Sequence, residues 1–149
     1  MGPNTSVNFG EIMFGVLLND KADRIIKNVI EEGMCLEAQI NRIEEVLPKL
    51  REMYLGKELS DEQAFISSTM LGSAIEELIE RRYHDSVCYI DEEMPGLILR
   101  EREDKTIYSF VEKIYEIITG KQLYKNITCD MWKTEALSSY FERVVDKKQ

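Results

Sequence analysis

The sequence predicts a mainly α-helical protein, a bundle of about five helices with one small β-hairpin or irregular loop near residues 86–100. Apolar residues recur at steps of three and four along most of the chain, as they do on one face of a helix. The 149 residues fit a single helical domain, 1–149, that is large enough to bury a core. Only 3 prolines and 8 glycines are present, too few for a disordered or fibrous chain.

The first expected helix is short and covers about residues 9–18. Asn8 is a suitable N-cap, whereas Gly10 and Gly15 lower the intrinsic helix propensity. Such a helix is stable only when it docks, either on its own bundle or on a partner subunit.

The second expected helix is long and amphipathic, and Asn19 or Asp20 can cap its N-terminus. Pro48 must end or kink it, because an interior proline removes one backbone hydrogen bond. Gly56 is the expected C′ residue at its C-terminal end. The apolar positions are Ile25, Ile26, Val29, Ile30, Leu36, Ile40, Ile43 and Leu47.

The third expected helix begins with a capping box formed by Ser60 and Gln63 and runs to about Arg82. Small side chains gather in its middle, which lets a neighbouring helix approach closely. These small residues are Ser67, Ser68, Gly72 and Ser73.

Two short β-prone stretches follow, Val87–Ile90 and Leu97–Leu99, with the turn signal Pro95-Gly96 between them. A fourth helix is expected between a cap at Asp104 and an end at Gly120. It is apolar around much of its circumference, which predicts a central place in the bundle.

Thr128 is the expected cap of a fifth helix. Its predicted buried face consists of Trp132, Leu137, Tyr140, Phe141, Val144 and Val145.

The formal net charge of −9, from 28 acidic and 19 basic side chains, disfavours direct binding to nucleic acid or to a membrane surface. It suits basic protein partners or divalent cations. The longest near-apolar stretch is far shorter than a membrane span. The three cysteines are widely spaced and form no C-x-x-C pair, so reduced thiols and a cytoplasmic location are expected.

Four acidic residues form the one pattern with a defined chemistry. Glu77 and Glu80 are three residues apart, and so are Glu101 and Asp104, so each pair shares a face if its segment is helical. Two such pairs on facing helices could hold Mg²⁺ through oxygen ligands. The alternative is a solvated helix face followed by an acidic helix start.

The E-E-x-x-E pattern from Glu76 to Glu80, followed by E-x-x-D from Glu101 to Asp104, resembles the signature of the all-α (MazG-like) nucleoside triphosphate pyrophosphatases. The resemblance covers about 30 residues. It implies that Glu77, Glu80, Glu101 and Asp104 bind magnesium and that a metal-bound water attacks the α/β-phosphate linkage. It would also give Glu76 a role in positioning that water.

The leading functional hypothesis is a protein–protein interaction module without a cofactor, acting as an adaptor, a regulator or an inhibitor. Amphipathic helices without a convergent polar site suit this role, and self-association as a homodimer or other homo-oligomer is expected. The magnesium-dependent pyrophosphatase is the alternative. An acidic inhibitor that mimics nucleic acid is a further alternative, although the interleaved basic residues favour an ordinary surface.

Overall fold

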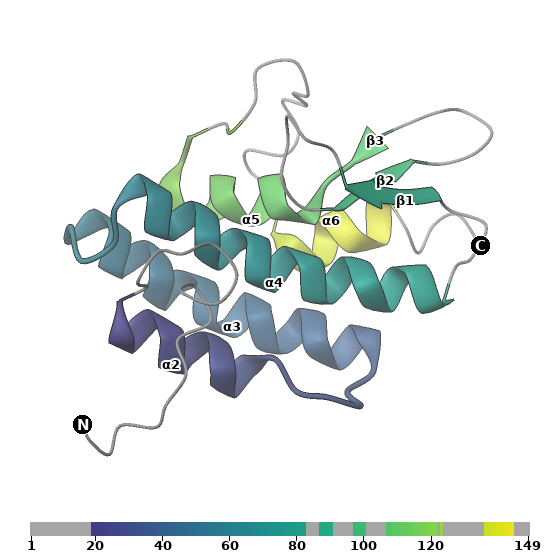
Figure 1. Ribbon diagram of the computed structural model, residues 1–149, viewed down its shortest axis with the longest axis horizontal. Helices are drawn as coiled ribbons and strands as arrows, with labels where there is room; N and C mark the ends of the chain where they lie inside the picture. The colour runs from purple at the N-terminus through teal and green to yellow at the C-terminus, as the bar shows by residue number, and fades with distance from the viewer. Residues whose placement is uncertain are drawn as a thin grey trace.

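The computed structural model describes residues 19–82, 87–90, 97–100, 107–121, 123 and 136–144. Its helices are α2 (Asp20–Val29), α3 (Leu36–Leu55), α4 (Asp61–Arg82), α5 (Phe110–Thr119) and α6 (Leu137–Val144). This confirms that the protein is mainly helical. In the view of Figure 1, α2 and α3 are drawn below α4, and α5 with three short strands is drawn above it; α3 also packs directly against α5. The helix expected at residues 9–18 lies outside the described residues.

The single long helix expected after Asn19 is divided into α2 and α3, so that prediction is wrong. The break occurs at Gly33, whose φ of 83° is the left-handed conformation that glycine adopts without strain. The buried amide of Gln39 spans the break: its Nε2 donates to the Val29 carbonyl at 2.8 Å, and its Oε1 accepts from the Glu31 amide at 3.3 Å. Pro48 does not end the helix, and α3 continues through it to Leu55.

The turn between α3 and α4 differs in one detail from the prediction. Gly56 has a φ of −83°, and the left-handed residue is Lys57, with a φ of 65°. The Gly56 amide donates to the Glu52 carbonyl at 2.9 Å, and the Glu58 amide donates to the Met53 carbonyl at 2.8 Å. These two bonds satisfy carbonyls at the end of α3.

The capping box at the start of α4 is confirmed. The Gln63 amide donates to Ser60 Oγ, and the Ser60 amide donates to Gln63 Oε1, both at 3.1 Å. The helix ends at Arg82, as predicted.

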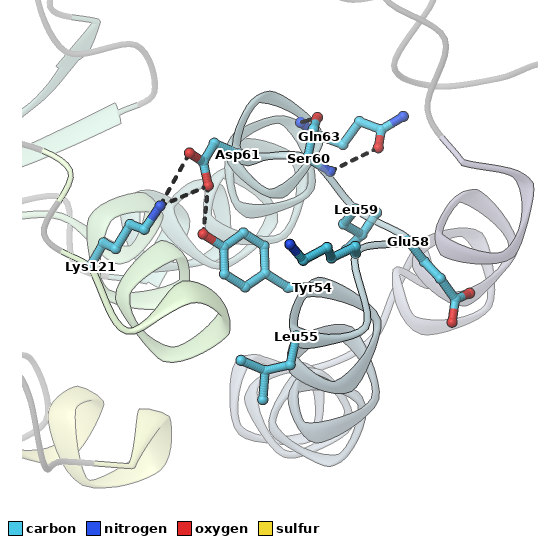
Figure 2. Close-up of a pocket in the computed structure, with 9 residues that line it drawn as sticks. Tyr54, Leu55, Glu58, Leu59, Ser60, Asp61, Gln63 and Lys121 are labelled. Atoms are coloured by element: carbon cyan, nitrogen blue, oxygen red, sulfur yellow. Dashed lines mark hydrogen bonds and ion pairs between the residues drawn. The ribbon is translucent and has the colours of Figure 1, made fainter.

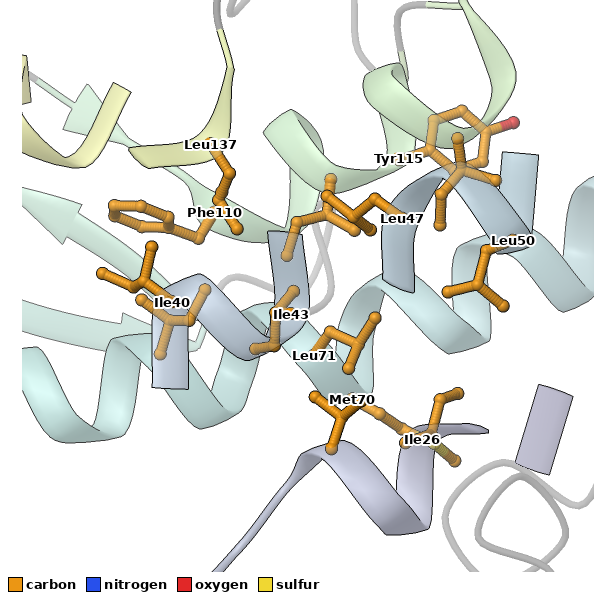
Figure 3. Packing of buried hydrophobic residues seen from close by; sticks show 14 of the residues in the cluster. Ile26, Ile40, Ile43, Leu47, Leu50, Met70, Leu71, Phe110, Tyr115 and Leu137 are labelled. Atoms are coloured by element: carbon orange, nitrogen blue, oxygen red, sulfur yellow. The ribbon is translucent and has the colours of Figure 1, made fainter. Parts of the chain in front are cut away.

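Small residues bring α4 and α5 together, as predicted. Ser67, Ser68 and Gly72 are buried, and a Cβ placed on Gly72 would lie 2.7 Å from the Val111 Cα and N atoms. Almost every residue of α5 is buried, which confirms its central position. Figure 3 shows the core between the helices, which includes Ile26, Ile40, Ile43, Leu47, Leu50, Leu71, Phe110 and Leu137.

Three antiparallel strands pair in the order β1 (Val87–Ile90), β2 (Leu97–Arg100) and β3 (Ile107–Tyr108). The two β-prone stretches coincide with β1 and β2. Residues 91–96 between them lie outside the described residues, so the choice between a small β-hairpin and an irregular loop stays a prediction.

The predicted start of the fourth helix after Asp104 is wrong, because residues 107 and 108 pair with β2 and belong to a strand. Ser109 caps α5 instead, and its Oγ accepts a hydrogen bond from the Glu112 amide at 3.2 Å. The predicted end is confirmed: Gly120 has a φ of 75° and its amide donates to the Glu116 carbonyl.

The C-terminal helix α6 begins at Leu137, and Ala136 before it is not helical, so a single continuous helix from the expected start to Val144 is excluded. The expected cap itself, Thr128, lies outside the described residues. Leu137, Tyr140 and Phe141 are buried, as predicted. The Ser138 amide donates to Glu44 Oε1 on α3 at 2.7 Å, which caps the helix from a distant part of the chain. Within the described ranges, no helix is both long and apolar enough to span a membrane.

Candidate functional site

Two of the four predicted magnesium ligands can be placed, and both lie at the surface of α4. Glu77 forms an ion pair with Arg81 at 3.7 Å, and Glu80 is exposed. Glu101 and Asp104 lie outside the described residues, so the convergence of the four carboxylates stays a prediction. The described part of the chain holds no group of histidine, cysteine or acidic side chains suited to a metal ion.

The acids that the fold buries are different ones. Asp23, Glu76, Glu112 and Glu116 are all buried, and Lys113, the residue after Glu112, is fully buried. Glu76 Oε2 accepts a hydrogen bond from the Phe110 amide at 2.7 Å, at the positive N-terminal end of the α5 dipole. The described contact of Glu76 is therefore a helix cap, which stabilises the junction of α4 and α5.

The opposite end of α4 carries the candidate site, a pocket of about 590 Å³ that we call the turn surface. The end of α3, the α3–α4 turn, the start of α4 and the residue after Gly120 form it (Figure 2). It is lined by Tyr54, Leu55, Lys57, Glu58, Leu59, Ser60, Asp61, Gln63 and Lys121.

Three of these side chains form a polar network. The Tyr54 hydroxyl donates to Asp61 Oδ1 at 2.6 Å, and Lys121 Nζ lies 3.1 Å and 3.2 Å from the two Asp61 oxygens. The same ammonium lies 5.6 Å from the centre of the Tyr54 ring (Figure 2). The Tyr54 hydroxyl, and then Lys121, lower the pKa of Asp61. Tyr54, and then Asp61, raise the pKa of Lys121, so both charged forms are favoured.

Leu55 stands out beside this network. It is 62% exposed and is the one large apolar side chain of the described ranges that is exposed. Lys57, two residues after Leu55, has a left-handed backbone conformation that is unfavourable for a residue with a Cβ. Asn19 Nδ2 donates to the Glu58 carbonyl at 3.3 Å, which ties the turn to the start of α2.

Sequence reasoning missed this site. Lys121 is 60 positions from Asp61, and their contact depends on how α5 packs on α4, which no local spacing reveals. The one available signal was Leu55 itself, an apolar residue at the end of a helix, next to a glycine.

Comparisons of the chain with protein-family models, with curated proteins and with solved structures return no match.

Proposed function

We propose that the protein is a protein–protein interaction module that binds its partner through the turn surface. The observation that carries the proposal is the exposed Leu55 beside a pocket that also offers charged groups and an aromatic ring. Apolar anchors surrounded by polar groups are characteristic of protein interfaces. The volume of about 590 Å³ can accommodate side chains of a partner.

The packing beneath the turn surface supports the proposal, since a binding surface works best on a rigid support. Leu50 and Met53 near the end of α3 and Leu59 in the turn itself are buried in the core. The capping box of Ser60 and Gln63 and the bonds at the end of α3 fix the backbone of the turn. A partner would therefore meet a surface that is already ordered.

A site-specific crosslink tests the proposal. A photo-reactive amino acid replaces Leu55 in one variant and Glu45 in a matched control, which is exposed on the same helix about 15 Å away. After irradiation in a lysate of the native host cells, we expect a discrete adduct from position 55 and none from position 45. The adducted protein, once purified, should bind the wild-type chain and should lose binding when Leu55→Ser is introduced.

Equal labelling from both positions, or no adduct from position 55, would refute the use of this surface. If position 55 does crosslink a partner, reconstitution of the purified pair shows whether the chain acts on that partner as an adaptor, a regulator or an inhibitor.

Self-association and a cytoplasmic, reducing environment remain parts of the proposal. The thiol of Cys35 is free and exposed, which is compatible with a reducing compartment. Light scattering tests self-association: a mass of 17.4 kDa at all concentrations would show that the chain is a monomer.

A further inference from the structure

The turn surface already holds a cation, and that cation belongs to the chain itself. The Lys121 ammonium lies 3.1 Å and 3.2 Å from the Asp61 oxygens and 5.6 Å from the centre of the Tyr54 ring. A carboxylate beside an aromatic ring is the combination by which proteins recognise cationic groups. The structure thus records how a positive charge is accommodated at this place.

Lys121 is held weakly. The side chains of Asp61 and Lys121 are 60% and 54% exposed, and ion pairs between such exposed side chains contribute little because water competes for both charges. Tyr54, in contrast, is half-buried, and its hydroxyl fixes the orientation of Asp61 through the 2.6 Å hydrogen bond. The carboxylate and the ring are therefore preorganised, whereas their present cation is replaceable.

We propose that Asp61 and Tyr54 form a binding site for an arginine side chain of the partner, and that this arginine displaces Lys121. This inference rests on the proposed interaction function. Leu55 contacts an apolar residue that flanks this arginine. A guanidinium suits the site better than an ammonium, because it can donate to both carboxylate oxygens at once and stack on the ring.

The charge of the pocket favours a cationic side chain. Its charged lining residues are Lys57, Glu58, Asp61 and Lys121, which together are neutral. When Lys121 leaves the pocket, the other three have a net charge of −1, and a bound arginine restores neutrality. An anionic ligand would instead meet the Asp61 carboxylate, whose two oxygens already accept hydrogen bonds.

Three short peptides test the site by NMR titration of the isotope-labelled chain: acetyl-Leu-Arg-Leu-amide, and the same peptide with citrulline or lysine in place of arginine. Citrulline keeps the shape of arginine and removes its charge. We expect the arginine peptide to shift the amide signals of Tyr54, Asp61 and Lys121 and to bind more tightly than the other two.

Two substitutions of lysine separate this proposal from general electrostatics. Lys121→Met removes the internal competitor, so the arginine peptide should bind roughly two- to fivefold more tightly, the factor expected when a weak surface ion pair no longer has to be broken. Lys49→Met is the matched control, because Lys49 is exposed and its loss changes the net charge equally. It should leave the affinity nearly unchanged.

Asp61→Asn should abolish binding of the arginine peptide.

Weaker binding by Lys121→Met, or equal gains in both lysine variants, would overturn the proposed displacement. Equal binding of the arginine and citrulline peptides would overturn the cation site. Either result leaves the crosslink from position 55 untouched, so failure of the arginine site and failure of the interaction function can be distinguished.

Discussion

Replacing Gly72 by alanine tests the close approach of α4 and α5. The new Cβ would lie 2.7 Å from the Val111 Cα and N atoms and 2.8 Å from its Cγ2 atom. Since two of these three atoms belong to the backbone, no rotation of the Val111 side chain relieves the overlap. The two helices must move apart.

The sign of the effect is what makes this substitution informative. Helix propensity alone predicts that alanine stabilises α4 by about 1 kcal/mol relative to glycine. Overpacking in a closely packed core costs about 1–3 kcal/mol. We therefore expect Gly72→Ala to lower the free energy of unfolding by about 1 kcal/mol and the Tm by about 3 °C.

Urea unfolding followed by circular dichroism measures this difference. Ser73→Ala, at the next and only partly buried position of α4, is the matched control and should be neutral or slightly stabilising. Val111→Ala in the Gly72→Ala background should fail to restore stability, because the backbone overlap remains. If Gly72→Ala is more stable than the wild type, the close approach of α4 and α5 is wrong.

Three further predictions concern helix ends. Lys57→Gly should raise the free energy of unfolding by about 0.5–1 kcal/mol, because glycine adopts the φ of 65° without Cβ strain; thermal unfolding measures the gain. The Arg82 guanidinium donates to Glu37 Oε1 at 2.7 Å and lowers the pKa of Glu37 from 4.5 to about 2. The Glu37–Arg82 pair therefore stabilises the fold fully above pH 4.5, and this stabilisation is lost as the pH falls towards 2. Arg82→Met should therefore reduce the urea midpoint at neutral pH more than near pH 2. Glu44→Ala removes the acceptor of the Ser138 amide and should cost about 1 kcal/mol, with faster hydrogen exchange in α6.

Each of these predictions has an outcome that contradicts it. Lys57→Ala keeps a Cβ, so a gain equal to that of Lys57→Gly would exclude relief of strain as the cause. A constant difference between Arg82→Met and the wild type across the acidic range would exclude the pairing with Glu37. Glu45→Ala alters a neighbouring exposed acid, and if it has the same effect as Glu44→Ala, the cap on α6 is wrong.

The helix ends that the sequence predicted best are those with a local signal. Ser60 and Gln63 mark the start of α4, and Gly120 marks the end of α5. Elsewhere a local signal competes with tertiary packing. Pro48 was expected to end or kink the helix, and α3 does not end there: Pro48 is exposed, and the buried Leu47 and Leu50 on either side of it anchor α3 in the core.

The start of α5 shows the same competition. Asp104 and Ser109 are both good N-caps, and the sequence offers no local reason to prefer the second. Ile107 and Tyr108 pair with β2 and cannot be strand and helix at once, so α5 begins only after them and Ser109 is its cap. Strand pairing of this kind depends on a partner segment that periodicity within one element does not identify.

The candidate site could not be predicted, because it joins three parts of the chain. Tyr54 and Asp61 flank one turn, but Lys121 reaches them only through the packing of α5 on α4. Tyr54 is half-buried at the end of α3, and its hydroxyl donates a hydrogen bond to Asp61 that apolar periodicity does not reveal.

The acids of α4 show what residue spacing can and cannot establish. Spacing by three places Glu77 and Glu80 on one face, but the rotation of the helix is set by Ile75 and Ile79, which are buried in the core. Glu76 lies on the side of these two isoleucines and becomes a buried cap, whereas Glu77, about 100° further round, faces solvent. A shared magnesium ion would therefore require Glu101 and Asp104 to reach the outer face of α4, with oxygens within about 2.0–2.6 Å of one ion. The distance from Glu77 to Asp104 thus decides between the pyrophosphatase hypothesis and a solvated helix face.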